Sequence, residues 1–194
     1  MASVPHIMAM DAATTTAVCR GKPGEVPRFK TKKFRGEDHL QICGSAIGWI
    51  SRELTDDPPD MAYIERPMPL GAAIHGKSNA KSIVRLNTLY GILGGACLLK
   101  GVPVIGVDVQ QARLAFIGDG QLERDEAKRR CLNMCRALGW PANNLDEGDA
   151  ACVWYWGCCC EAPRIAAVIH PGMHSKVASL TMAQELGREL GVLP

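Results

Sequence analysis

Four carboxylates stand at positions that a folded chain can bring together. Asp11 and Glu65 each end a short apolar run, while Asp146 and Asp149 stand three residues apart in Asp-Glu-Gly-Asp. Carboxylate oxygens are hard ligands that suit Mg²⁺ or Mn²⁺. Two such ions about 3.5–4 Å apart support phosphoryl displacement, because one activates the attacking water and the other supports the leaving 3′ oxygen. The four residues therefore predict a two-metal centre, with two Mg²⁺ or Mn²⁺ ions, for phosphodiester chemistry.

The acidic pair Asp146 and Asp149 is the first half of this centre. A spacing of three puts both carboxylates on one face of a helix, where like charges repel. No basic residue lies within a turn of them in the sequence. A bound cation would relieve the repulsion. The alternative is an acidic first turn that interacts favourably with the helix dipole.

Glu65 belongs to the other part of this predicted metal centre, the part that the strands supply. It ends the apolar run of residues 61–65, and Pro67 and Pro69 then prevent a regular strand or helix from continuing. Open α/β sheets hold their ligands at the carboxyl ends of such central strands. The alternative is that Glu65 is a capping or surface residue.

Hydrophobic patterning predicts the elements that must position these side chains. Strands are expected over residues 6–11, 12–20, 27–34, 61–65 and 102–107, and helices over 38–54, 78–99, 110–116, 123–138, 146–156 and 175–190. Ser78 is the expected N-cap of the long glycine-rich helix. Strands first and β-α alternation later favour an α/β fold, a mixed sheet flanked by helices.

The composition is that of an ordinary globular chain. It has 194 residues, 47% hydrophobic content, a net charge of +2 and nine cysteines. The odd cysteine count and the lack of a recognisable signal sequence predict a reduced, cytoplasmic protein with buried thiols. The longest apolar stretch, residues 89–99, is expected to be too short to span a membrane. Cys158, Cys159 and Cys160 with His170 and His174 are an alternative zinc set, although they lack the usual C-x2-C spacing.

Basic residues are concentrated in one stretch. Between Arg20 and Arg35 there are seven, with Glu25 as the lone acid. A second group follows Glu65 at Lys77, Lys81 and Arg85. Such stripes can follow a phosphate backbone even when the total charge is near neutral. The alternative is a solvated edge hairpin whose lysines prevent aggregation.

Taken in order, these motifs resemble the RuvC-type Holliday-junction resolvases of the RNase H-like superfamily. The similarity covers residues 7–157 and rests on Ile64-Glu65, residues 79–91, Ile117-Gly118 with the basic stretch at Lys128, and Asp146-x-x-Asp149-Ala-Ala. The resemblance implies an RNase H-like mixed central β-sheet flanked by α-helices. It also implies that Asp11, Glu65, Asp146 and Asp149 are the metal ligands of a dimeric enzyme that cuts two strands of a DNA junction and leaves 5′-phosphate ends.

The resemblance carries over less closely at other positions. Met68 falls where the family has a base-stacking wedge, and Lys128 lies near a basic catalytic position, with Arg113 as its neighbour. Ala12-Ala13-Thr14 departs from the family's glycine-bearing turn, and such departures suggest a divergent, phage-type member. The residues expected to contact DNA are Arg28, Lys30, Lys32, Lys33, Met68, Lys77, Lys81, Arg85 and Arg113.

The sequence thus predicts a metal-dependent endonuclease acting on branched DNA. Residues 1–157 would form the nuclease domain, and residues 158–194 a helical extension packing on it. The helix over residues 78–99 would form the seam of a homodimer, since its small residues allow close packing. Two alternatives remain: a nuclease of the same fold acting on RNA or RNA–DNA hybrid, and a DNA-binding protein without catalysis.

Overall fold

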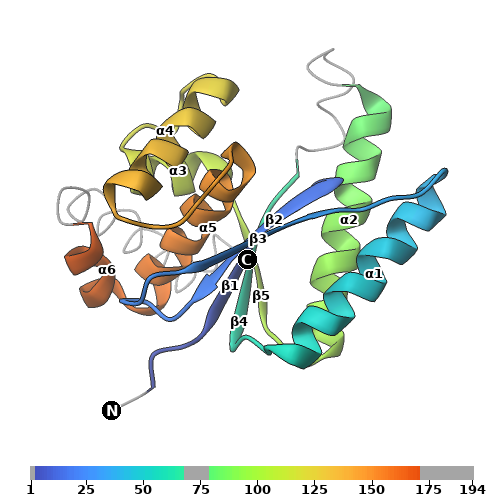
Figure 1. The fold of residues 1–194 in the computed structure, drawn as a ribbon, viewed down its shortest axis with the longest axis horizontal. Helices are drawn as coiled ribbons and strands as arrows, with labels where there is room; N and C mark the ends of the chain where they lie inside the picture. Colours follow the sequence, from blue (N-terminus) through green and yellow to red (C-terminus); the bar gives the residue numbers. More distant parts are fainter. Residues whose placement is uncertain (1–2, 68–78, 171–194) are drawn as a thin grey trace, which may run out of the picture.

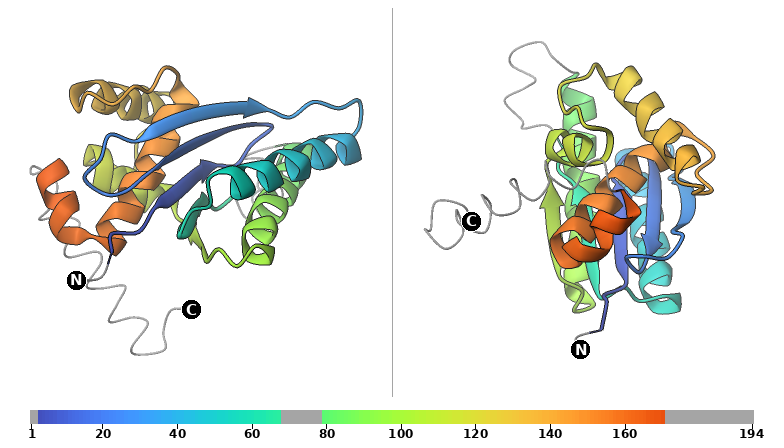
Figure 2. Two further views of the ribbon diagram at one scale, coloured as in Figure 1. Left: turned by 60° about the horizontal axis from the view of Figure 1, so that its bottom comes forward. Right: turned by 90° about the vertical axis from the view of Figure 1, so that its left-hand side faces the viewer.

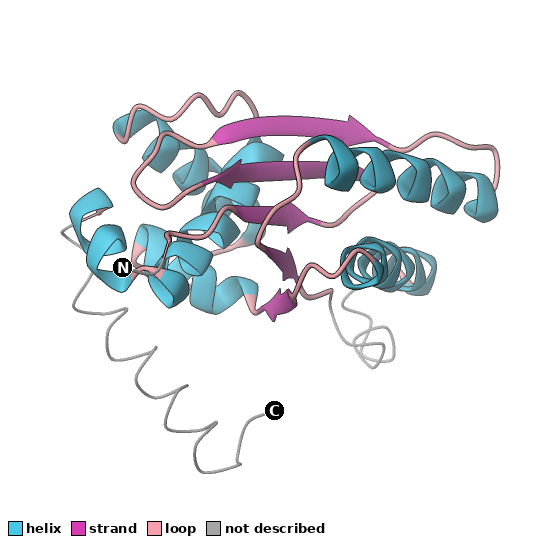
Figure 3. Ribbon diagram, turned by 90° about the horizontal axis from the view of Figure 1, so that it is seen from below, coloured by secondary structure: helices cyan, strands magenta, loops and turns pink. Residues whose placement is uncertain are grey.

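A mixed five-stranded sheet forms the centre of the molecule. The computed structural model describes residues 3–67 and 79–170. The strands are β1 (Ile7–Asp11), β2 (Thr15–Gly21), β3 (Arg28–Lys33), β4 (Met61–Glu65) and β5 (Val104–Val107). They lie in the order β3-β2-β1-β4-β5, with β1 antiparallel to β2 and parallel to β4 (Figure 3). The mixed sheet predicted from the sequence is confirmed.

Two helical layers cover the sheet. The helices are α1 (His39–Asp56), α2 (Ala80–Leu99), α3 (Val109–Ile117), α4 (Arg124–Ala137), α5 (Leu145–Glu161) and α6 (Pro163–Ile169). The pair α1 and α2 covers one face, and α3 to α6 lie on the other (Figure 1). The left view of Figure 2 also shows the two layers on opposite sides of the sheet.

Most helix boundaries lie within two residues of the sequence prediction, helix α6 was not predicted, and the start of α2 and the end of α5 call for comment. Asn79 caps α2 by accepting a hydrogen bond from the Lys81 amide, whereas Ser78 lies outside the described residues. Helix α5 continues to Glu161, past the predicted end at residue 156, because its apolar side chains still find buried partners there. It therefore runs across residue 157, where the nuclease domain was predicted to end. That boundary stays a prediction, and the helix expected over residues 175–190 lies outside the described chain.

The alternation of side chains along β1 and β4 decides which face each catalytic candidate occupies. Ile7 and Ala9 of β1 pack in the core beneath α5, whereas Met8 and Met10 pack in the core beneath α1 and α2. Tyr63 of β4 likewise faces α5. Because side chains alternate with a period of two, the next odd-numbered residues in each strand, at positions 11 and 65, also face α5.

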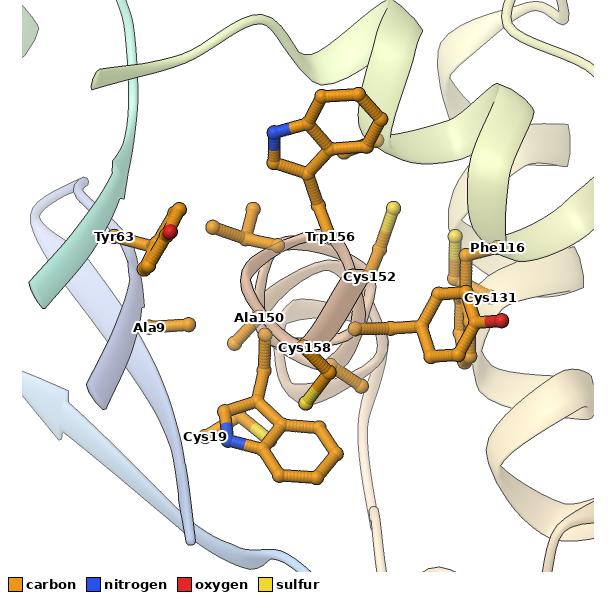
Figure 4. Packing of buried hydrophobic residues seen from close by; sticks show 14 of the residues in the cluster. Ala9, Cys19, Tyr63, Phe116, Cys131, Ala150, Cys152, Trp156 and Cys158 are labelled. Atoms are coloured by element: carbon orange, nitrogen blue, oxygen red, sulfur yellow. The ribbon is translucent and has the colours of Figure 1, made fainter. Parts of the chain in front are cut away.

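Helix α5 is the centre of the larger core. Figure 4 views it with Ala9, Cys19 and Tyr63 of the sheet on one side and Phe116 and Cys131 of the outer helices on the other. Two glycines let the helix approach its neighbours closely. A Cβ at position 148 would lie 2.8 Å from the Leu132 amide nitrogen, and one at position 157 would lie 3.0 Å from the Tyr63 ring. Close packing of this kind fixes the helix along its whole length.

Helix α2 has a buried face and an exposed face. Leu89 and Leu93 are buried against the sheet and α1, while Val84 and Leu98 are 52% and 62% exposed. By length and composition α2 is long enough to cross a membrane, with a mean hydropathy of 1.4 and 28% of that window buried. The apolar stretch was predicted from residues 89–99 to be too short to span a membrane, and by length and composition alone that prediction is wrong. Its buried inner face is that of a helix in a globular layer.

The cysteines contribute to packing. Eight of the nine are buried, Cys160 is exposed, and none in the described chain forms a disulfide. Burial raises the pKa of the Cys19, Cys152 and Cys158 thiols, which keeps them protonated. The expectation of buried thiols is therefore confirmed.

Candidate active site

The sheet brings Asp11 and Glu65 together. They end the parallel neighbours β1 and β4, in which Met10 pairs with Ile64. Both carboxylates lie at the same edge of the sheet and on the face covered by α5. Each sits at the carboxyl end of a strand, where the sequence had predicted a site.

A capped helix start supplies Asp146 and Asp149. The Asn144 side chain accepts a hydrogen bond from the Glu147 amide at 2.9 Å, and the Glu147 carboxylate accepts one from the Asn143 amide at 2.7 Å. The same carboxylate accepts a hydrogen bond from the Thr31 hydroxyl of β3 at 2.9 Å. The sequence analysis missed this network. Its signal was the Asn-x-x-Glu pattern of a capping box.

Three of the four predicted ligands form one compact group. Carboxylate oxygens of Asp11, Glu65 and Asp149 all lie within 4.8 Å of one another. We call this group the carboxylate triad. Asp146 stands beside it, with its Oδ1 atom 2.7 Å from the Lys128 Nζ atom. The triad offers hard oxygen donors of the kind that Mg²⁺ and Mn²⁺ prefer.

Cations from two other helices relieve the repulsion between these carboxylates. Lys128 of α4 has its Nζ atom 3.3 Å from Asp149 and 3.8 Å from Asp11. Arg113 of α3 has its Nη2 atom 3.4 Å from Asp149. Both side chains are about 10% exposed, so these ion pairs are little screened by water. The partners lie 18 and 36 residues away in the chain, which is why the sequence around the acidic pair did not reveal them.

Burial makes ionisation of these carboxylates unfavourable. It raises the pKa of Asp11 to about 6 and that of Glu65 to about 8, with further increases from the neighbouring carboxylates and partial relief from Lys128. Burial alone would lower the pKa of Lys128, but Asp149 and Asp11 raise it above its ordinary value. The site thus favours cations and disfavours additional negative charge.

Among residues 3–67 and 79–170, the triad is the only group of three or more potential metal ligands that close together. The alternative zinc set of Cys158, Cys159, Cys160 and His170 does not gather within the described chain, and His174 lies outside it. Within the described residues the candidate metal ligands are therefore carboxylate oxygens.

The basic strand divides into two parts. Lys30 pairs with Glu53 of α1, and Arg28 pairs at 2.8 Å with Asp57, the residue that follows the end of α1, so these two cations stabilise the packing of α1. Lys32 and Lys33 pair across the sheet with Thr16 and Thr15, at the end of the strand nearest Asp11. No ion pair is found for either lysine within the described chain.

The remaining predicted DNA contacts lie apart from one another. Arg113 is buried against Asp149 and belongs to the acidic centre instead of an open surface. Lys81 is exposed at the start of α2, and Arg85 is half-buried one turn later. Met68 and Lys77 lie outside the described residues.

Comparison with known proteins agrees with this architecture. The sheet order, the two helical layers and the acidic edge define an RNase H-like α/β fold. Two solved structures have this fold: "Thermus thermophilus RuvC structure", with a TM-score of 0.59 and 16% identity over 87% of this chain and 96% of that one, and "T. thermophilus RuvC in complex with Holliday junction substrate", with a TM-score of 0.58 and 14% identity over 77% and 90%. The predicted fold class is confirmed.

The sequence comparison leads to the same group of proteins. The chain is similar to the crossover junction endodeoxyribonuclease RuvC of Nitratidesulfovibrio vulgaris, from strains DP4 and Hildenborough, with 28% identity over 109 residues. The match covers 54% of this chain and 60% of the length of those relatives. No family model matches the chain. The resemblance to RuvC-type proteins is thus confirmed, while the activity of the whole protein is a matter for proposal.

The raised pKa of Glu65 predicts a pH-dependent cost of the acidic centre. In the metal-free protein the folded state holds this proton more tightly than the unfolded state, so the resulting stability is present below about pH 4.5 and is lost as the pH rises through about 8. The glutamine side chain of Glu65→Gln does not ionise, so this variant does not lose stability in that pH range. We expect the free energy of unfolding of Glu65→Gln minus that of the original protein to be larger, in the stabilising direction, by about 1–3 kcal/mol near pH 9 than near pH 5.

Urea denaturation with a chelator at both pH values measures this difference. The control is Glu126→Gln, which removes an exposed carboxylate that pairs with Arg129 and Arg130 on the surface of α4. It should show no such gain at high pH. If Glu65→Gln changed the free energy of unfolding by the same amount at both pH values, the raised pKa of Glu65 in a buried acidic centre would be contradicted.

Proposed function

We propose that this protein is a metal-dependent, structure-selective endonuclease that resolves four-way or branched DNA junctions by paired symmetric nicks and leaves 5′-phosphate ends. The observation that carries the proposal is the carboxylate triad, gathered from two parallel strands and one helix at the edge of an RNase H-like sheet. The similarity to RuvC supports branched DNA as the substrate. Buried cysteines without disulfides suit a reducing compartment, the cytoplasm.

The donor set fits two Mg²⁺ or Mn²⁺ ions held by Asp11, Glu65, Asp146 and Asp149. When bound, such ions supply an activated water and stabilise the charge on the leaving oxygen. The chain itself supplies rigid placement. The strand ends hold Asp11 and Glu65, the capped start of α5 holds the acidic pair, and Arg113 fixes the orientation of Asp149 through its contacts with both carboxylate oxygens at 3.4 Å. Placement of this kind lowers the reorganisation required during phosphoryl displacement.

The DNA backbone would follow the edge of the sheet. Lys32 and Lys33 lie at the end of β3 near Asp11 and are available for phosphate contacts. Lys81 and Arg85 lie in the first turns of α2 and would add phosphate contacts. Phosphate contacts position DNA without reading its sequence, so the branched shape would provide most of the selectivity.

A homodimer would present two such centres to two strands of one junction. The exposed face of α2 supports this part of the proposal. Val84, Thr88, Gly91, Gly95 and Leu98 recur at helical spacing on that face, and a Cβ at either glycine would meet nothing within 4 Å. Small and apolar residues in such a stripe allow two helices to pack closely.

Removal of one triad ligand tests the nuclease directly. With Mg²⁺, the original protein should produce paired nicks near the branch point of an end-labelled four-way junction and leave linear duplex intact. Asp149→Asn removes one ligand and one negative charge. Its single-turnover cleavage rate should fall by about a thousandfold or more, while junction binding stays equal or becomes tighter.

The matched control is again Glu126→Gln, which removes a carboxylate outside the centre and should cleave normally. Chelator should abolish cleavage by the original protein. Full activity of Asp149→Asn would contradict the metal centre. Degradation of RNA or hybrid with no junction cleavage would replace the substrate, and junction binding without any cleavage would indicate a DNA-binding protein.

The division of the basic strand predicts which lysines bind DNA. Neutralising Lys32 and Lys33 together should weaken junction binding and reduce the slope of log K against log salt by about 2, because each phosphate contact releases counterions. The control is Arg28→Gln with Lys30→Gln, which removes the same charge from residues already paired with Asp57 and Glu53. Equal salt slopes for the two double variants would contradict this DNA path.

The oligomeric state tests the role of α2. We expect the original protein to sediment as a dimer, and Gly95→Lys to sediment as a monomer because the new side chain adds bulk and charge at the seam. Asn133→Lys adds the same charge on an exposed position of α4 and should leave the dimer intact. A Gly95→Lys dimer would contradict the seam.

A further inference from the structure

The Lys128 ammonium lies among three of the four carboxylates. Its Nζ atom is 2.7 Å from Asp146, 3.3 Å from Asp149 and 3.8 Å from Asp11. The side chain is 10% exposed and comes from α4, which packs closely against α5. A lysine on a DNA-contacting surface would instead direct its charge toward solvent.

The carboxylates therefore form two overlapping sets. One is the triad of Asp11, Glu65 and Asp149, and the other consists of Asp11, Asp146 and Asp149 around the ammonium. Two members are common to both sets. Two divalent ions held by Asp11, Glu65, Asp146 and Asp149 would draw on the same carboxylates. The arrangement is that of a two-cation centre in which one cation belongs to the protein.

We propose that Lys128 is the resident cation of the second metal position, so that the centre without DNA accepts one divalent ion at the triad and admits the second only when the lysine is displaced. This inference rests on the proposed metal centre. It assigns Lys128 a role in controlling metal occupancy, beyond that of a basic residue on the catalytic face.

Charge and flexibility make the exchange possible. An ammonium and a divalent ion within a few ångströms repel strongly in a buried site. The four-carbon stem of lysine lets the head group move away without any shift of the backbone. Arg113 differs, because Asp149 is the one member of the four carboxylates with which it forms an ion pair in the described chain, whereas Lys128 contacts three. A bound DNA phosphate would add the negative charge that compensates for a second ion.

Metal titration without DNA provides the test. Isothermal calorimetry with Mn²⁺ should give one ion per protomer for the original protein. Lys128→Met should bind two ions, with second-site affinity increased about tenfold or more by the removal of one unit charge. Electron paramagnetic resonance should detect an exchange-coupled Mn²⁺ pair in Lys128→Met at metal concentrations where the original protein gives an isolated ion.

Two controls separate this effect from a general loss of charge. Arg129→Met removes a cation from an exposed position next to Lys128 on α4 and should leave one ion per protomer. Lys128→Arg keeps the charge and should also bind one ion. Equal stoichiometry and affinity in Lys128→Met and the original protein would overturn the proposal. Failure of every variant to bind Mn²⁺ would instead refute the metal centre itself.

A second measurement uses only the original protein, so it does not depend on the folding of Lys128→Met. Amine acylation followed by mass spectrometry reports the accessibility of Lys128. Its labelling should be slow at low Mn²⁺ and should increase about tenfold or more as the second ion displaces the ammonium, while the exposed Lys100 labels equally throughout. Constant protection of Lys128 with two ions bound would overturn the proposal.

Discussion

Electrostatic repulsion among four carboxylates at one edge of the sheet is the constraint on which the rest of this structure depends. Burial raises the pKa of Asp11 and Glu65, so the site resists ionisation unless cations accompany it. Lys128 and Arg113 provide that compensation from α4 and α3. The arrangement of these two helices against α5 is therefore part of the chemistry as well as of the core.

The sequence could predict the half of the site that is local. Asp11 and Glu65 end apolar strands, and their placement on one face follows from the period of two along each strand. The spacing of Asp146 and Asp149 likewise required only a helix. The pairing of Lys128 with Asp146 could not be read in this way, because it depends on how α4 packs on α5, and this close approach requires a glycine at position 148.

The basic strand shows the same limit. Its positive charge is evident in the sequence, but the division of labour within it is set by α1. Glu53 of that helix and its C-cap residue Asp57 bind Lys30 and Arg28, whereas Lys32 and Lys33 lie at the same end of the sheet as Asp11, two strands away. A charged stretch in the sequence thus predicts a basic surface. Which of its side chains are available for a ligand depends on the ion pairs that they form with neighbouring elements.

A metal-bound crystal structure is the most direct test of the central claim that this edge of the sheet is a cation centre. Crystals soaked in Mn²⁺ would be measured at a wavelength where manganese scatters anomalously. We predict an anomalous peak among the oxygens of Asp11, Glu65 and Asp149. A fully occupied Mn²⁺ elsewhere, with these three carboxylates free of metal, would contradict the account.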